Sequence, residues 1–221
     1  YPGYYNINTG QLRSKYYDTF VQRIAPFSVV RFLQPLQIDA HPCDNGVQYN
    51  NVTCIHRWAN RIPADYIVYS GPKGVSYDAV IQMANDLNFD PWINIPNAVD
   101  DAFVNNLAVL VRDNLRNDRR AIIEWGNEPW NANPYTGPYL TNMGPYLNYF
   151  DPQFPGSNFW AGQRYYVRRS LEIFKIFDDT FGSQGNRLVR VLNTQAGYPF
   201  IGTKILEFSR DPQIYNVNGQ T

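Results

Sequence analysis

Short apolar runs alternate along this chain with longer segments in which apolar residues recur about every 3.6 positions. A short run of β-branched and aromatic residues that ends at a turn-forming residue is typical of a strand buried in a parallel sheet. The longer spacing indicates a helix that buries one face. We therefore predict strands over 27–33, 89–95, 121–125 and 187–192, and helices over 76–87, 100–115 and 163–181.

Single strands that alternate with single helices predict an α/β fold, in which helices cover a parallel sheet. Periodicity does not decide between an open doubly wound sheet and a closed (β/α)8 barrel. We treat residues 1–221 as one domain with two long polar segments, one over 39–60 and one over 131–160. The second segment is rich in Pro, Gly, Asn and Tyr. We expect it to be a loop, and loops of that length are usually functional.

Polar side chains gather where the predicted strands end. In parallel α/β folds the carboxyl ends of the strands carry the active site, because the loops that follow them converge over the sheet. We therefore expect these side chains to meet at one edge of the sheet. They are Arg31 and Gln34, Asn94 and Asn97, Glu124, Asn127 and Glu128, and Asn193 and Gln195.

Glu124 and Glu128 are the two carboxylates at the end of the third predicted strand. Cleavage of a glycosidic bond uses two carboxyl groups, about 5–5.5 Å apart when the second is a nucleophile and roughly 6.5–9.5 Å apart when water attacks. Residues four apart on an extended chain are well separated, at about 3.3 Å per residue. We expect Glu124 to lie deeper and to support Glu128 or Arg31 by hydrogen bonding, and not to be the second catalytic group.

The run at 122–129, Ile-Ile-Glu-Trp-Gly-Asn-Glu-Pro, resembles the fourth-strand Asn-Glu motif of clan A glycoside hydrolases, which are cellulase-like (β/α)8 barrels. The resemblance implies that Glu128 is the acid/base and that Asn127 binds the sugar 2-hydroxyl next to the scissile bond. It also implies that Arg31 is a supporting arginine at a strand end. A wider likeness to large barrel proteins of that clan extends over most of the chain, from 31 to 189.

Two features depart from the pattern of that clan. Asn97 stands where a His is expected after Ile-Pro, which changes one substrate or supporting contact. The clan's nucleophile is a Glu at the end of the seventh strand, whereas the strands predicted here reach only the fourth. We therefore expect a partial barrel. Alone, such a barrel would leave long strand edges open, an arrangement that natural proteins avoid. The chain is either an excerpt of a longer polypeptide or a reduced barrel whose edges are covered by neighbouring copies.

Aromatic residues make up 16% of the chain, with 17 Tyr and 5 Trp, while charged residues make up only 17%. Aromatic rings cover the apolar face of a sugar and amides bind its hydroxyls, so this mixture suits contact with a polysaccharide or oligosaccharide. The candidate sugar platforms are Trp92, Trp125 and Trp130. Packing among Tyr-rich loops explains the same composition, and we expect core packing for at least one of the three tryptophans.

Basic and acidic residues number 19 each, so the formal net charge is zero and no strong field attracts nucleic acid or anionic lipid. No apolar run is long enough for a membrane span. The chain has no Gly-rich phosphate loop, and His41 and His56 lie in one segment without metal-ligand spacing, so we expect no cofactor and no metal. It opens at Tyr1 without the features of a signal peptide, which indicates a mature or excised sequence.

Cys43 and Cys54 flank a short segment rich in Asp, Asn and Gly, and we predict that they form a local disulfide. Such a bridge stabilises by about 2–3 kcal/mol and implies an oxidising compartment. Asn51 begins an Asn-Val-Thr sequon for N-glycosylation within the same segment. The two signals together predict a secreted glycoprotein. The alternative is two free thiols and an unused sequon.

Two classes of function stay open. The first is a retaining glycoside hydrolase that acts on an extracellular or cell-wall polysaccharide, with Glu128 as acid/base. The second is a non-catalytic structural or carbohydrate-binding glycoprotein, such as a matrix or filament subunit, on the same scaffold, because a fold does not determine a function. In that case Arg31 and Glu124 are only a buried ion pair. A strand ending in Glu after Thr221 in the parent chain would favour the first class.

Overall fold

The computed structural model describes residues 4–5, 12–14, 16–38, 42–66, 71–132 and 136–215. A four-stranded parallel sheet in the order β3-β4-β5-β6 forms its centre. The strands are β3 (Val29–Arg31), β4 (Asp90–Ile95), β5 (Ala121–Trp125) and β6 (Leu188–Val191). The predicted α/β class with a parallel sheet is therefore confirmed.

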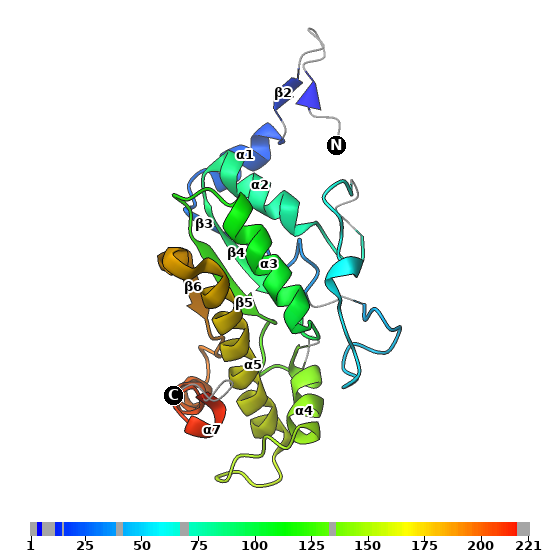
Figure 1. Cartoon of the computed structure of the whole chain (residues 1–221), viewed down its shortest axis with the longest axis vertical. Helices are drawn as coiled ribbons and strands as arrows, with labels where there is room; N and C mark the ends of the chain where they lie inside the picture. The colour runs from blue at the N-terminus through cyan, green and yellow to red at the C-terminus, as the bar shows by residue number, and fades with distance from the viewer. Residues whose placement is uncertain are drawn as a thin grey trace.

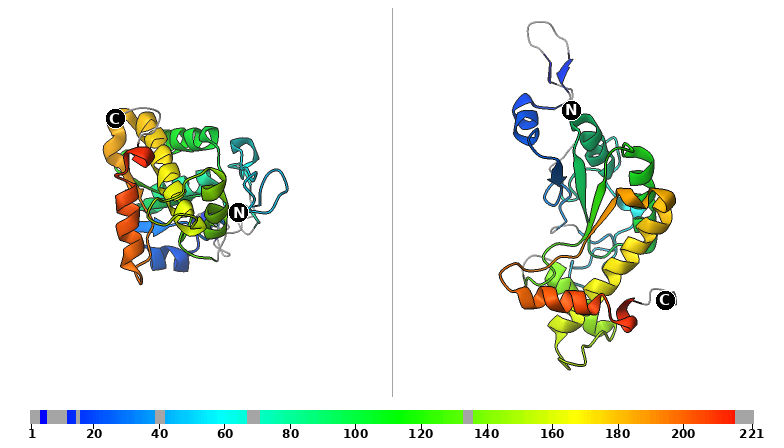
Figure 2. Two further views of the ribbon diagram at one scale, coloured as in Figure 1. Left: turned by 90° about the horizontal axis from the view of Figure 1, so that it is seen from below. Right: turned by 90° about the vertical axis from the view of Figure 1, so that its left-hand side faces the viewer.

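Long helices lie along one side of this sheet, as Figure 1 and the right-hand view of Figure 2 show. They are α2 (Tyr77–Leu87), α3 (Asp101–Asn114) and α5 (Asn158–Phe181). The carboxyl ends of the strands point toward the end of the molecule that carries α4 (Thr136–Tyr146), α6 (Pro199–Phe208) and α7 (Pro212–Tyr215). The opposite end carries α1 (Asp18–Ile24) and the hairpin of β1 (Tyr4–Tyr5) and β2 (Leu12–Ser14).

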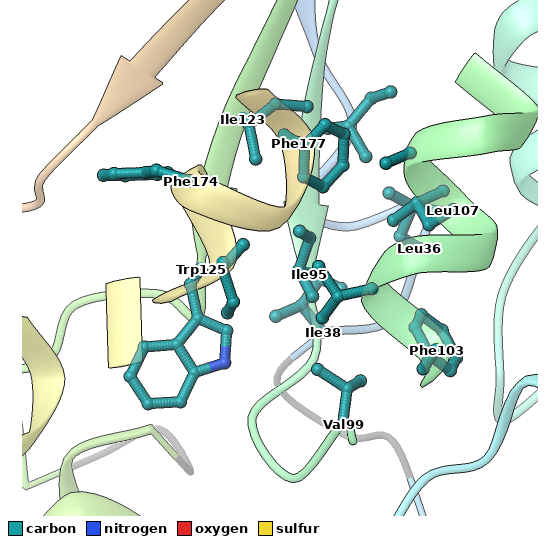
Figure 3. Close-up of a cluster of buried hydrophobic side chains, with 14 of the residues drawn as sticks. Leu36, Ile38, Ile95, Val99, Phe103, Leu107, Ile123, Trp125, Phe174 and Phe177 are labelled. Atoms are coloured by element: carbon teal, nitrogen blue, oxygen red, sulfur yellow. The ribbon is translucent and has the colours of Figure 1, made fainter. Parts of the chain in front are cut away.

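The hydrophobic core lies between the sheet and the helices. Side chains alternate between the two faces of a strand, so Ile123 and Trp125 face the helices while Glu124 faces the other way. Figure 3 shows the cluster, in which Ile95, Ile123 and Trp125 of the sheet meet Phe103 and Leu107 of α3 and Phe174 and Phe177 of α5. Each large apolar side chain that is removed from water contributes roughly 1.5–3 kcal/mol.

Side-chain caps explain where the long helices begin. The Ser76 hydroxyl accepts the Ala79 N–H at 3.1 Å, which confirms its predicted position before α2. The carboxylate of Asp100 accepts the Phe103 N–H at 2.7 Å before α3. Ser157 caps α5 in the same way, and this helix therefore begins at Asn158, five residues before the predicted start.

The prediction of a continuous loop over 131–160 is wrong, because the segment contains α4. Gly137, Gly144 and Pro145 lower the helix propensity of this stretch and give it the composition of a loop. The structure shows why the glycine at 144 is needed. A Cβ there would lie 2.3 Å from the carbonyl carbon of Ala161, and one at Gly162 would lie 2.9 Å from the backbone of Leu140. Small residues let α4 and α5 pack backbone against backbone.

Other boundaries also differ from the predictions. The first strand of the parallel sheet covers only Val29–Arg31, because the chain turns after Phe32 and Phe27 is exposed. The helices α1, α6 and α7 were not predicted, and neither were the short 3-10 helices Trp58–Asn60 and Gly182–Arg187. In α1 no residue is buried, so its sequence carries little periodic signal.

The predicted disulfide between Cys43 and Cys54 is present. It closes the polar segment after β3, and positions 39–41 at the start of that segment lie outside the described residues. The segment is attached to the body of the protein by an ion pair between Lys73 and Asp44 and by the His56 N–H, which the Ala98 carbonyl accepts at 2.9 Å. Within the described ranges, every helix is too short or too polar to cross a membrane.

His56 gives this segment a defined pH response. It is buried beside the disulfide, and this burial lowers the pKa of its imidazole from 6.5 to about 4. Between these two pH values the unfolded chain binds a proton that the folded protein does not bind. The contribution of neutral His56 to the free energy of unfolding is therefore fully present above pH 6.5, and it decreases as the pH falls toward 4.

We predict that the free energy of unfolding falls by ~3 kcal/mol more in the wild type than in His56→Gln over this interval. Urea unfolding at a series of pH values measures both proteins. Carboxylates that titrate at lower pH are shared by the two proteins, so their contribution cancels in the comparison. Identical pH dependence in the two proteins would show that His56 is not buried as a neutral imidazole.

Candidate functional site

Glu124 of β5 is a fully buried carboxylate, with 0% of its surface exposed. The Arg31 guanidinium donates to both of its oxygens, from Nε to Oε2 at 3.0 Å and from Nη2 to Oε1 at 2.7 Å. The Asn94 side-chain amide donates to Oε2 at 2.7 Å, and that of Asn193 donates to Oε1. Each carboxylate oxygen therefore accepts two hydrogen bonds, which offset the cost of burying its charge.

The donors lie on or directly after the other three strands of the parallel sheet. Arg31 ends β3, Asn94 belongs to β4, and Asn193 follows β6, while Glu124 itself lies on β5. The register places Asn94 directly opposite Glu124, and both side chains point to the face that α2, α3 and α5 do not cover. The four predicted strand ends thus meet at one carboxylate. Gln34 and Gln195, which the sequence placed with them, are not among the donors.

A tight turn follows β5 and presents the Asn-Glu pair. Gly126 has φ +69° and Glu128 has φ +44°, so both adopt the left-handed conformation. That conformation costs a non-glycine residue roughly 1–2 kcal/mol. The Gly126 N–H binds the Ile95 carbonyl at 2.8 Å, and the Asn127 side-chain oxygen accepts from Arg31 at 3.2 Å. The Glu124 network therefore extends directly into the turn.

Glu128 ends this turn and is half-buried. The Asn131 side-chain amide donates to its Oε2 at 2.9 Å, and the Asn131 backbone N–H donates to its carbonyl at the same distance. Behind it, the side chain of Gln163 on α5 donates to the Pro129 carbonyl at 2.8 Å. These contacts fix the direction of the Glu128 carboxyl group. Among the residues that the structure describes, none that belongs to a strand binds this carboxyl group.

The three candidate tryptophans have different environments. Trp125 is fully buried, stacks on Tyr166 and donates its N–H to the carbonyls of Pro96 and Asn97, so its assignment as a sugar platform is wrong. Its place in the alternation of β5 turns it toward the helices. Trp92 is half-buried, and the Arg31 guanidinium carbon lies over it, 5.2 Å from the centre of the Trp92 ring. Trp130 is half-buried and packs against the core.

Asn97 is buried and faces the turn. Its side-chain oxygen accepts a hydrogen bond from the Thr136 hydroxyl at 3.0 Å, so in this structure it binds another side chain of the site. Thr136 and Tyr166 were missed by sequence reasoning. The Tyr166 hydroxyl accepts the Asn193 N–H at 2.7 Å, and burial raises the pKa of this phenol far above its usual range. A tyrosine in an amphipathic helix gives no signal that distinguishes such a role from packing.

The sequon lies in the disulfide segment. Asn51 and Thr53 are both exposed, and the Asn51 side-chain oxygen accepts from the Thr53 N–H at 2.9 Å and from its hydroxyl at 2.8 Å. Nearby, Cys43, Cys54 and His56 form a buried cluster of potential metal ligands. Both sulfur atoms are bound in the disulfide and so are not thiolates, the form of cysteine that binds metal.

Comparisons with models of protein families, with curated proteins and with solved structures find no match to this chain. The resemblance to clan A glycoside hydrolases therefore rests only on the sequence around Asn127 and Glu128.

Removal of the arginine tests how strongly Glu124 depends on its partners. We predict that Arg31→Ala lowers the free energy of unfolding by about 3 kcal/mol, because it leaves a buried carboxylate without its countercharge. Arg190→Ala is the matched control, since Arg190 pairs with Asp178 and both side chains are more than a third exposed. This control should cost less than about 1 kcal/mol. Equal losses in chemical denaturation would contradict the dependence of Glu124 on Arg31.

Proposed function

We propose that this chain is part of a (β/α)8 barrel glycoside hydrolase that acts on an extracellular or cell-wall polysaccharide with retention of configuration. Glu128 is its general acid/base, Asn127 binds a sugar hydroxyl, and Arg31 with Glu124 supports them. The observation that carries the proposal is the turn at 126–128 at the carboxyl end of a parallel sheet, in which Glu128, next to Asn127, has a strained left-handed conformation. Strained non-glycine residues concentrate at functional sites.

The topology supports a barrel over a doubly wound sheet. In a doubly wound sheet the strand order reverses and helices cover both faces, whereas in a barrel the strands follow one another in sequence and the helices lie outside. The strands here run in the sequential order β3-β4-β5-β6. The helices α2, α3 and α5 all lie on the same side of them (Figure 2). Arg31, Trp92, Asn94 and Glu124 then face the interior of the proposed barrel.

Glu124 is poorly suited to be the nucleophile. Its two oxygens accept four hydrogen bonds, which lower the nucleophilicity of a carboxylate and leave it no access to a sugar carbon. We assign it to the support of Arg31 and Asn127. The nucleophile in this proposal is a second carboxylate on a strand other than β3, β4, β5 and β6, from the same polypeptide or from a neighbouring copy.

The disulfide supports a site of action outside the cell. A bridge between Cys43 and Cys54 persists in an oxidising compartment, and the exposed sequon at Asn51 lies within the segment that it closes. We propose that the protein is secreted and that Asn51 carries an N-glycan. Material for functional assays is therefore best purified from the natural source, where its intact mass before and after glycosidase treatment shows whether Asn51 is modified.

A non-catalytic glycoprotein on the same scaffold is the second candidate. It is favoured by the four hydrogen bonds that occupy the Glu124 carboxylate, because a charged network that joins four strands has a structural role whether or not the protein is an enzyme. In this alternative Asn127 and Glu128 bind a glycan without cleaving it. The two candidates differ in one measurable property, which is the turnover of an oligosaccharide.

We predict that Glu128→Gln lowers the hydrolysis of an unactivated oligosaccharide by roughly 10²–10⁴-fold, since the amide keeps the shape of the carboxyl group but cannot donate its proton. A substrate with a good leaving group needs less protonation and should lose less activity. Binding of the oligosaccharide should stay close to that of the wild type. Turnover of both substrates and binding by calorimetry measure the three quantities.

Glu172→Gln is the control, because this glutamate lies on α5 and pairs with Arg168 and Arg169 instead of joining the site. Its turnover should match that of the wild type. Unchanged turnover in Glu128→Gln would remove the acid/base assignment. A wild-type protein that binds the oligosaccharide and never cleaves it would favour the non-catalytic candidate.

A further inference from the structure

Thr136, the first residue of α4, connects that helix to the turn that carries Glu128. Its side chain is fully buried. The hydroxyl oxygen accepts the backbone N–H of Asn127 at 2.9 Å, and the hydroxyl proton is donated to the side-chain oxygen of Asn97 at 3.0 Å. One hydroxyl group thus joins the loop after β4, the turn after β5 and the start of α4.

The same side chain also packs against the turn. A Cβ added to Gly126 would lie 2.8 Å from the Thr136 methyl group and 3.0 Å from the Asn97 side-chain oxygen. Gly126 therefore meets both neighbours closely, and its φ of +69° is a conformation that other residues adopt at a cost. The position of the turn is limited by this contact on one side and by the Arg31 hydrogen bond to Asn127 on the other.

We infer that Thr136 is a positioning residue for the acid/base, and that its hydroxyl, oriented by Asn97, sets the place of Asn127 and Glu128 over the sheet. The inference rests on the proposed function and adds a residue to it. The residue types fit the task closely. The site needs a single atom that accepts a hydrogen bond from an N–H and also donates one to an amide oxygen. Among small side chains only a hydroxyl oxygen does both.

Asn97 has a specific part in this arrangement. Because its side-chain oxygen accepts the hydroxyl proton, a lone pair of Thr136 is directed toward the Asn127 N–H. This accounts for an amide at the position where the clan pattern has a His. An aliphatic residue at 97 would leave the Thr136 hydroxyl free to rotate.

Two substitutions at Thr136 distinguish the effect of its hydroxyl group from the effect of its methyl packing. Thr136→Val keeps the shape and removes the hydroxyl, whereas Thr136→Ser keeps the hydroxyl and removes the methyl group. We expect Thr136→Val to lower kcat on an unactivated oligosaccharide by about 10–100-fold at unchanged KM, because a small displacement of a catalytic group has an effect of this size. Thr136→Ser should restore most of the activity. Both variants should lose less on a substrate with a good leaving group.

Thr141→Val is the matched control on the same helix. Its half-buried hydroxyl donates to the Gly137 carbonyl at 2.8 Å, so this variant also loses a hydrogen-bonded hydroxyl from α4 but no contact with the turn. A purely structural role of Thr136 would lower the melting temperature and leave kcat per folded molecule unchanged. Wild-type kcat in Thr136→Val, or equal losses in Thr136→Val and Thr141→Val, would overturn the inference.

Hydrogen exchange tests the positioning without any substrate. The Asn127 amide should exchange about tenfold faster in Thr136→Val than in the wild type or Thr136→Ser, as expected for the loss of one hydrogen bond. Unchanged exchange would refute the positioning role. If the wild type cleaves no glycan, the proposed function fails, and this measurement alone decides whether Thr136 holds the turn.

Discussion

A single buried carboxylate, Glu124, determines how the strand ends of this protein are arranged. A charge removed from water is stable only when donors replace its hydration, and here the donors come from the strand ends around it. Arg31, Asn94 and Asn193 must therefore stay within hydrogen-bonding distance of one residue. A shift of any strand by one position would turn its donor to the opposite face and leave the charge unpaired.

The turn that carries Asn127 and Glu128 depends on this network and on its own neighbours. Arg31 reaches past Glu124 to the side chain of Asn127, so one guanidinium holds both the strand and the turn. The left-handed conformation of Glu128 is unfavourable alone. It persists because Asn131 binds the carbonyl and the carboxylate of Glu128 itself, while Thr136 holds Asn127, the residue before it. Rigidity of this kind is what a catalytic or a binding site requires.

The sequence predicts the parallel sheet and most of the site because both follow simple rules. Strand ends of a parallel sheet share one edge, so Arg31, Asn94, Asn127 and Asn193 were placed together by position alone. Helix α4 could not be predicted, since Gly144 serves a close approach to α5 and Gly137 one to the backbone of Asn131, and composition does not distinguish such glycines from those of a loop. Thr136 and Tyr166 act through contacts 9 and 27 residues away in sequence, and no local pattern encodes such pairs.

A double-mutant cycle between Arg31 and Glu124 tests this account most directly. Arg31→Met, Glu124→Gln and the double variant are compared with the wild type in the free energy of unfolding. The account predicts that the sum of the losses in the two single variants exceeds the loss in the double variant by more than about 1 kcal/mol, because each residue stabilises mainly through the other. Losses that add to within about 0.5 kcal/mol would contradict it, since they would show that the carboxylate does not depend on the arginine.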